Sequence, residues 1–125
     1  MRRVILDANF MLLPLERKVD VYSKLEDFLD DRVGLFAPKA VFDELRGMAG
    51  RGNKEARVAK ACLQLAQMRG VGEIASMNKK PDDAIMEIAQ KTDVVCTVDA
   101  ALAARLKGKG VRTVAVKANG NLASR

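Results

Sequence analysis

Four acidic residues stand where a fold could bring them together. Asp7 follows the apolar run VIL and Asp99 follows VVCTV, while Glu44 lies in VFDEL and Asp83 in PDDAIMEIA. Carboxylates suit Mg²⁺ and Mn²⁺, which usually bind a few acids together with waters and substrate phosphate. Such an ion can supply a hydroxide nucleophile and neutralise charge on a phosphodiester under attack. We therefore take these four residues as candidate metal ligands and catalytic groups.

The chain contains no histidine, which excludes a Ser-His-Asp triad, a histidine acid-base pair and a histidine-ligated zinc site. Cys62 and Cys96 form no CxxC pair, and Cys96 lies within an apolar run. We expect both thiols to be reduced and buried, because disulfide frameworks use denser spacing. Carboxylates remain the main resource for catalysis.

Two polar residues accompany the acids at short spacing. Asn9 lies two residues after Asp7 and could orient it through a hydrogen bond. Thr97 lies two residues before Asp99, so on a strand both would point to the same side of the sheet. In a purely structural interpretation, Asp7 is a turn residue and Asp99 a helix N-cap. Glu44 carries little weight alone, because most Glu side chains are solvated.

Asp82 and Asp83 follow Pro81, at the expected start of a helix. Acidic residues suit this end of the helix dipole, and one of the two is expected to cap the helix. Capping and metal binding could thus be divided between them. The residues alone leave open which of the two is the ligand.

The formal net charge is +6, from 22 Lys and Arg against 16 Asp and Glu, which favours a polyanionic partner. The candidate acids lie at strand ends, whereas the bases cluster at residues 46–57, 79–80 and 105–117, as expected of an acidic pocket between basic rims. Taken singly, each base is more simply a solvated surface residue. The candidates for phosphate contacts, by position, are Arg46, Arg51, Lys54, Arg57, Lys79, Lys80 and Arg105.

Strand and helix patterns alternate from end to end, which predicts an α/β layered domain. The apolar runs before Asp7 and Asp99 indicate buried parallel strands, whose carboxyl ends form the edge where such sheets bind ligands. One domain is expected over residues 1–118, with a flexible tail over 119–125. Strands are expected at 3–7, 33–37, 73–76, 93–98 and 111–116, and helices at 19–31, 38–47, 55–69, from 82 or 83 onward, and around Leu102 and Leu106.

No run of the sequence approaches the ~20 apolar residues of a membrane span. The apolar stretch near the N-terminus is too short for a secretory signal. We expect a cytoplasmic protein without a membrane partner.

Four segments, in order along the chain, resemble those of PIN-domain ribonucleases: VILDANFML, APKAVFDEL, PDDAIMEIA and VVCTVDAALAARLKGKGVRTVAV. The resemblance runs from Arg3 to about Val116 and implies a three-layer α/β/α sandwich around a parallel sheet of about five strands. It also implies an endoribonuclease that depends on Mg²⁺ or Mn²⁺ and cleaves RNA by water attack, leaving a 3′-hydroxyl and a 5′-phosphate. Homodimers are common in such a family.

The resemblance also assigns roles to residues. Asp83 is favoured over Asp82 because DAIMEIA matches the DAxIxxxA pattern of the family's helix, which leaves Asp82 as an outer or fifth acid. The seven bases named above would contact RNA. The implied catalytic and metal-binding residues are Asp7, Glu44, Asp83 and Asp99, with Asn9 and Thr97 as supporting polar residues.

Two groups within the family compete for this chain. VapC-type toxins pair with a small antitoxin, whereas ribosome-biogenesis nucleases cut precursor ribosomal RNA beside ribosome-assembly proteins. The segments KPDDAIMEIA and TVDAALAARLKGKG are nearer to the second group, or to archaeal stand-alone members close to it.

Functions of other classes fit less well. A receiver domain would need an acidic pair after the first strand, and an aspartyl phosphatase would need DxD, which Asn9 breaks. The main alternative is a catalytically silent PIN-fold protein that binds RNA or acts as a scaffold.

Overall fold

A central sheet of six strands organises the computed structural model, which describes residues 1–125. The sheet order is β3-β2-β1-β4-β5-β6, with β1 to β5 parallel and β6 antiparallel to β5. Strands β2 and β3 are added on one side of β1, and β4, β5 and β6 on the other side. The topological switch point therefore lies between β1 and β4. The strands are β1 (Arg2–Leu6), β2 (Val33–Pro38), β3 (Gly72–Ile74), β4 (Val94–Cys96), β5 (Arg112–Val116) and β6 (Leu122–Ser124).

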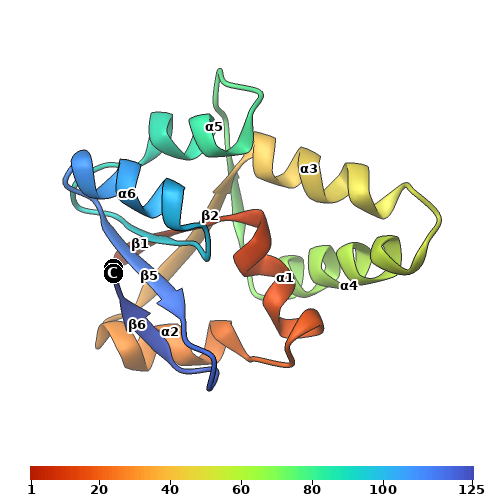
Figure 1. Ribbon diagram of the computed structural model, residues 1–125, viewed down its shortest axis with the longest axis horizontal. Coiled ribbons are helices and arrows are strands. Elements are labelled where there is room, and N and C mark those ends of the chain that lie inside the picture. The colour runs from red at the N-terminus through yellow and green to blue at the C-terminus, as the bar shows by residue number, and fades with distance from the viewer.

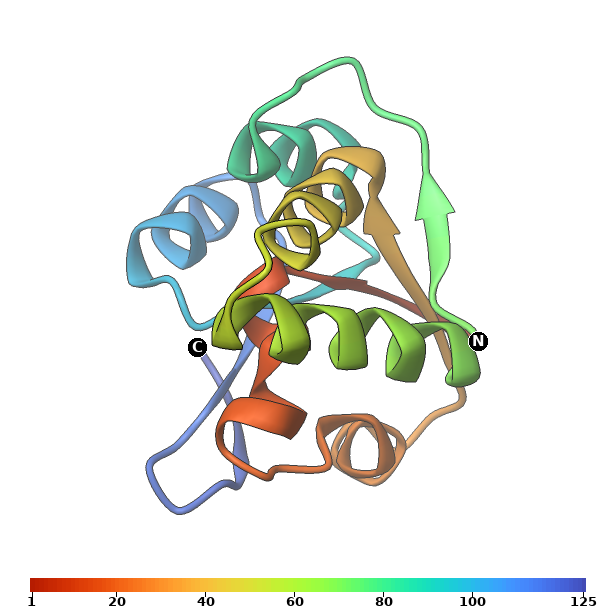
Figure 2. The same ribbon diagram turned by 90° about the vertical axis from the view of Figure 1, so that its right-hand side faces the viewer.

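Six helices surround this sheet: α1 (Ala8–Glu16), α2 (Val21–Leu29), α3 (Lys39–Ala49), α4 (Lys54–Met68), α5 (Pro81–Ile88) and α6 (Ala100–Gly108). Helices α1, α2 and α4 cover one face, and α5 and α6 cover the other (Figures 1 and 2). This division follows from right-handed crossovers, because the direction of building reverses after β3. Helix α3 contacts both α4 and α5, near the carboxyl ends of the strands. The predicted three-layer α/β/α sandwich is therefore confirmed.

The core lies on both sides of the two central strands. Every residue of β4, and Val4, Ile5 and Leu6 of β1, is buried, which agrees with their continuous apolar runs. Cys62 and Cys96 are buried free thiols, as predicted. None of the six helices is both long enough and apolar enough to cross a membrane.

Helix α1 was not predicted. Its sequence, ANFMLLPLE, is apolar on most sides, so no helical periodicity separates a buried face from a solvated one. Phe10, Met11, Leu12 and Leu13 are all buried, because α1 packs between the sheet and α4. The consequence for function is that Asp7 ends a strand and begins a helix at the same time.

The predicted flexible tail over residues 119–125 is instead an edge strand. Residues 117–121 form a turn with Gly120 at φ +87°, and β6 then pairs with β5 in register Val116↔Leu122. Leu122 is only 7% exposed, and Lys24 donates to the carbonyl of Gly120 at 2.9 Å. An Asn-Gly turn that returns an apolar side chain to the core accounts for the added strand. The sheet thus has six strands rather than about five, and the domain includes residues that were assigned to the tail.

Candidate active site

The carboxyl ends of β1 and β4 are neighbours at the switch point, and Asp7 and Thr97 follow them directly. Asp7 is 4% exposed and Thr97 is fully buried. Asp7 Oδ1 accepts the N–H of Ala8 at 2.7 Å, and its Oδ2 accepts the hydroxyl of Thr97 at 2.9 Å. Two strands and the first turn of α1 thereby fix the Asp7 carboxylate in one orientation.

Asp99 joins the same network through Thr97. The N–H of Asp99 donates to the Thr97 hydroxyl oxygen at 3.0 Å. Asp99 Oδ1 caps α6 by accepting the N–H groups of Ala101 at 2.8 Å and Leu102 at 3.1 Å. Its Oδ2 has no hydrogen-bond partner in the protein. The N-cap interpretation is therefore compatible with a ligand role, because each oxygen of one carboxylate can serve a different purpose.

Glu44 and Asp82 complete an acidic group with Asp7 and Asp99. Burial raises the pKa of Asp7 to about 6, and the negative charges of Asp82 and Glu44 add to this rise. The pKa of Glu44 is raised by partial burial and then by Asp82, and that of Asp82 by burial and then by Asp99. Asp7, Glu44 and Asp82 thus lie close enough to repel one another electrostatically, and Asp99 acts on Asp82.

Asp83 faces a different neighbour from Asp82. Its Oδ1 accepts Arg105 Nη2 at 3.0 Å, in an ion pair that joins α5 to α6. Both acids lie in the first turn of α5, where successive side chains face different directions. Neither caps the helix, because the N-cap residue Lys80 has no side-chain cap bond, contrary to the sequence prediction. Of these two acids, only Asp82 is among the charges that raise the pKa of Asp7.

The donors at this edge suit Mg²⁺ or Mn²⁺ by type, since they are carboxylate oxygens whose charges repel in a partly buried setting. As placed, however, no three acidic or cysteine side chains converge tightly enough to hold an ion. Repulsion between like charges gives a physical reason for that separation. Glu44 and Asp82 are less buried than Asp7, so they have room to turn toward a cation.

Asn9 does not orient Asp7 in this structure. Its side chain makes no hydrogen bond and lines a cavity beside the acidic group, whereas Thr97 supplies the hydrogen bond to Asp7. Glu16 and Glu55 line the same cavity and were not singled out from the sequence. A sequence prediction that included α1 would have placed Glu16 two helical turns after Asn9, on the same side of the helix. No sequence pattern predicts that Glu55, at the start of α4, lies near these two residues.

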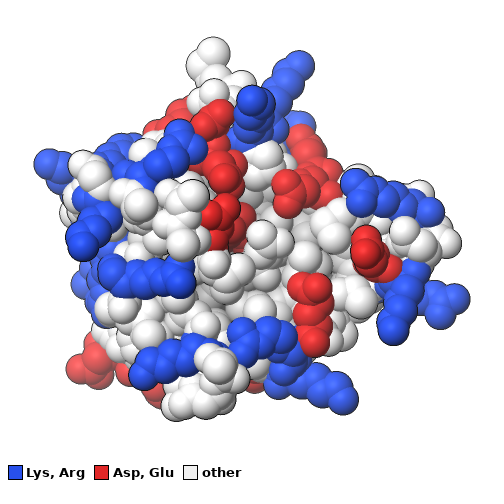
Figure 3. Space-filling model, viewed as in Figure 1, with Lys and Arg blue, Asp and Glu red and all other residues white.

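The predicted phosphate-binding bases fall into two groups. Arg46 forms ion pairs with Asp43 at 3.2 Å and Glu73 at 2.7 Å, and Arg105 is held by Asp83. Figure 3 shows acidic side chains gathered in the upper middle of one face, with Lys and Arg around its margin. The other five predicted bases are exposed and form no ion pair: Arg51, Lys54, Arg57, Lys79 and Lys80.

The fold and this site define a doubly wound α/β domain with an acidic group at the switch point of its sheet. A model of the PIN like domain matches residues 4–119, so the chain belongs to the PIN-like domain family. This membership supports a nuclease of the PIN type.

Two solved structures share the fold. The structure of the PIN domain endonuclease Utp24 has a TM-score of 0.79 and 23% identity, covering 98% of this chain and 90% of that chain. A domain of a functionally unknown protein from Methanocaldococcus jannaschii DSM 2661 has a TM-score of 0.62 and 15% identity, covering 94% and 93%. No curated protein matches the sequence.

Proposed function

We propose that this protein is a metal-dependent endoribonuclease that hydrolyses RNA phosphodiester bonds. The observation that carries the proposal is the buried Asp7 carboxylate at the switch point, which Thr97 links by hydrogen bonds to Asp99, with Glu44 and Asp82 near enough to raise the pKa of Asp7. Without a bound cation, these carboxylates would repel the phosphates of RNA. A cation between the carboxylates and the RNA is therefore required for binding at this site. Exposed bases at the margin are placed to bind the RNA backbone on either side.

The ion, Mg²⁺ or Mn²⁺, would activate a water and neutralise charge on the scissile phosphate. Asp7 is suited to be the fixed ligand, because Thr97 and the N–H of Ala8 hold its carboxylate in place. Asp99 can offer Oδ2 while Oδ1 remains on α6. Glu44 has no hydrogen-bond partner, and its raised pKa suits it to accept a proton from the attacking water at a carboxylate oxygen.

Asp82 is proposed as the fourth acid at the ion. Asp83, which the family pattern favours, is proposed to act through Arg105, which it positions at the mouth of the site. Substituting each acid separately distinguishes the two assignments. Asp82→Asn should abolish metal-dependent cleavage, whereas Asp83→Asn should reduce it only partly.

The test is cleavage of an end-labelled RNA pool with Mn²⁺ or Mg²⁺, compared with EDTA and with Asp7→Asn. Cleavage that disappears in both controls supports the proposal, and the fragment ends should carry 3′-hydroxyl and 5′-phosphate groups. Wild-type protein that binds RNA but never cleaves it would instead favour the silent RNA-binding or scaffold function. The cleaved sequence would separate ribosomal RNA processing from a toxin-type activity, and light scattering would test the expected homodimer.

A further inference from the structure

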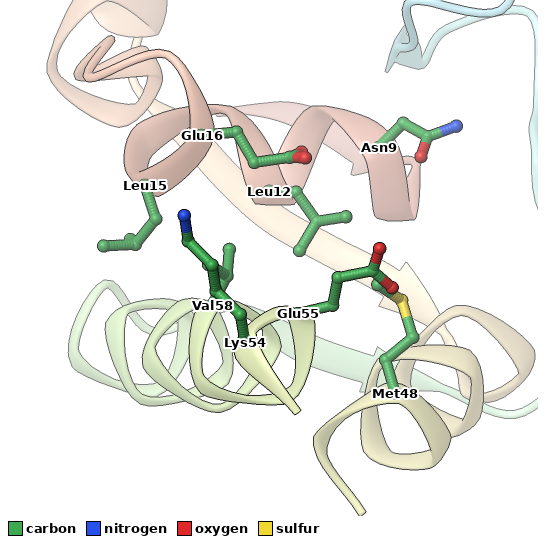
Figure 4. A pocket seen from close by; sticks show the side chains of 8 residues that line it. All are labelled: Asn9, Leu12, Leu15, Glu16, Met48, Lys54, Glu55 and Val58. Atoms are coloured by element: carbon green, nitrogen blue, oxygen red, sulfur yellow. The ribbon is translucent and has the colours of Figure 1, made fainter. Parts of the chain in front are cut away.

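A cavity of about 580 Å³ opens beside the acidic group, between α1 and the α3–α4 hairpin. Figure 4 shows the side chains that line it, of which four are apolar and the others polar or charged. Leu12 and Leu15 come from α1, Met48 from α3 and Val58 from α4. Leu15 is 42% exposed, so this apolar surface is accessible from solvent.

Two helices, α1 and α3, connect the lining of the cavity with the acidic site. Asn9, at its near end, lies two residues after Asp7 on the first turn of α1. Met48 lies one helical turn after Glu44 on α3, and therefore on the same side of that helix. A chain that placed a phosphate at the acids could thus place an adjoining group in the cavity.

Two carboxylates give the cavity its chemical character. Glu16 extends from the end of α1 and Glu55 from the start of α4, on opposite sides of the Leu12 side chain (Figure 4). Both residues are exposed, and neither carboxylate forms an ion pair within the protein. Both are acceptors only, so they suit a ligand with N–H donors on its rim. The apolar lining of Leu12, Met48 and Val58 suits an apolar body for that ligand.

We propose that this cavity binds one unpaired nucleobase of the RNA substrate and that Glu16 and Glu55 make it selective for guanine. Guanine carries adjacent N1–H and N2–H donors, which match the two oxygens of one carboxylate. Adenine and cytosine offer only an exocyclic amino group on that edge, and uracil only one imino N–H. Unstacked bases of single-stranded RNA are commonly recognised in this way, between side chains and through their Watson–Crick edge.

The bases beside the cavity offset the repulsion between these carboxylates and the RNA. Lys54 belongs to the cavity lining, Arg51 lies on the α3–α4 connection and Arg57 in the first turn of α4, and none of the three forms an ion pair. They are placed to bind phosphates that flank the inserted nucleotide. The inference rests on the proposed function for its substrate class, RNA, but its test measures binding and does not require cleavage.

The experiment uses the Asp7→Asn protein with Mg²⁺, so that bound RNA stays intact. Fluorescence anisotropy would compare oligouridine strands that carry a single central G, A, C or U. We expect the strand with G to bind about tenfold more tightly than the others, which is the scale of a bidentate contact. In Glu16→Gln and Glu55→Gln backgrounds that ratio should fall toward one, while Glu26→Gln, a matched change of an exposed carboxylate on α2, should preserve it.

The ratio between bases separates recognition from simple electrostatics, since removal of a negative charge would tighten all four strands alike. Equal binding of the four strands by the parent protein overturns the inference, as does a guanine preference that survives in both cavity variants. Cleavage by the wild type is measured separately. Metal-dependent cleavage without base preference would remove the cavity proposal alone, and guanine preference without cleavage would remove the nuclease proposal alone.

Discussion

Two buried aspartates of this protein should respond in opposite ways to the same substitution. Asp7 is 4% exposed and has carboxylates as its charged neighbours, whereas Asp93 is 3% exposed and accepts two bonds from Arg3, at 2.9 and 2.7 Å. In the absence of a metal ion, Asp7→Asn should stabilise the protein at neutral pH. Asp93→Asn should destabilise it, by about 3 kcal/mol, because it leaves a partly buried guanidinium without its partner.

The magnitude for Asp7 follows from its pKa. Folding raises that pKa from 3.8 to about 6, so the folded state binds the proton more tightly than the unfolded state. The free energy of unfolding therefore falls as pH rises from about 4 to 6, and the loss is complete above pH 6, at about 3 kcal/mol. An asparagine cannot ionise, and it can still accept from Ala8 and donate to the Thr97 oxygen, so it should remove most of this cost.

The assay is urea denaturation of the wild type, Asp7→Asn and Asp93→Asn in EDTA, at pH 4 and pH 8. The advantage of Asp7→Asn over the wild type should grow by about 2 kcal/mol or more between the two pH values. An Asp7→Asn protein that is less stable than the wild type at pH 8, by an amount independent of pH, would refute the view that burial and repulsion strain this carboxylate. Adding Mn²⁺ should reverse the order, because only the carboxylate gains a ligand bond.

Three further outcomes are expected. Thr97→Val should lower the free energy of unfolding by about 1–3 kcal/mol in urea denaturation, since it leaves a buried oxygen of Asp7 without its donor, and Thr97→Ser should restore most of the loss. Glu87→Ala should speed amide hydrogen exchange at residues 77–78, whose N–H groups the Glu87 carboxylate accepts at 2.8–3.1 Å, and unchanged exchange there would contradict this. Leu122→Ala should cost about 2–4 kcal/mol by urea denaturation if β6 is part of the core, and almost nothing if residues 119–125 are a flexible tail.

The alternation of apolar runs and amphipathic segments was enough to predict an α/β layered domain, and the resemblance to PIN-domain nucleases implied the three-layer sandwich. The alternation also placed Asp7 and Asp99 at the carboxyl edge of a parallel sheet, because continuous apolar runs that end in a polar residue indicate buried parallel strands. Spacing likewise placed Thr97 beside Asp99. These features are local, since each depends only on residues a few positions apart.

Three features depended on contacts that spacing does not encode. Helix α1 is apolar on most sides, so its sequence shows no alternation of apolar and polar residues with the helical period. Strand β6 forms because the edge of β5 is available for pairing. The sequence by itself determined that acids would gather at one edge of the sheet. Only the tertiary structure decided that the charge of Asp82 acts on Asp7 while Asp83 pairs with Arg105, because neighbouring positions on a helix differ in which other elements they face.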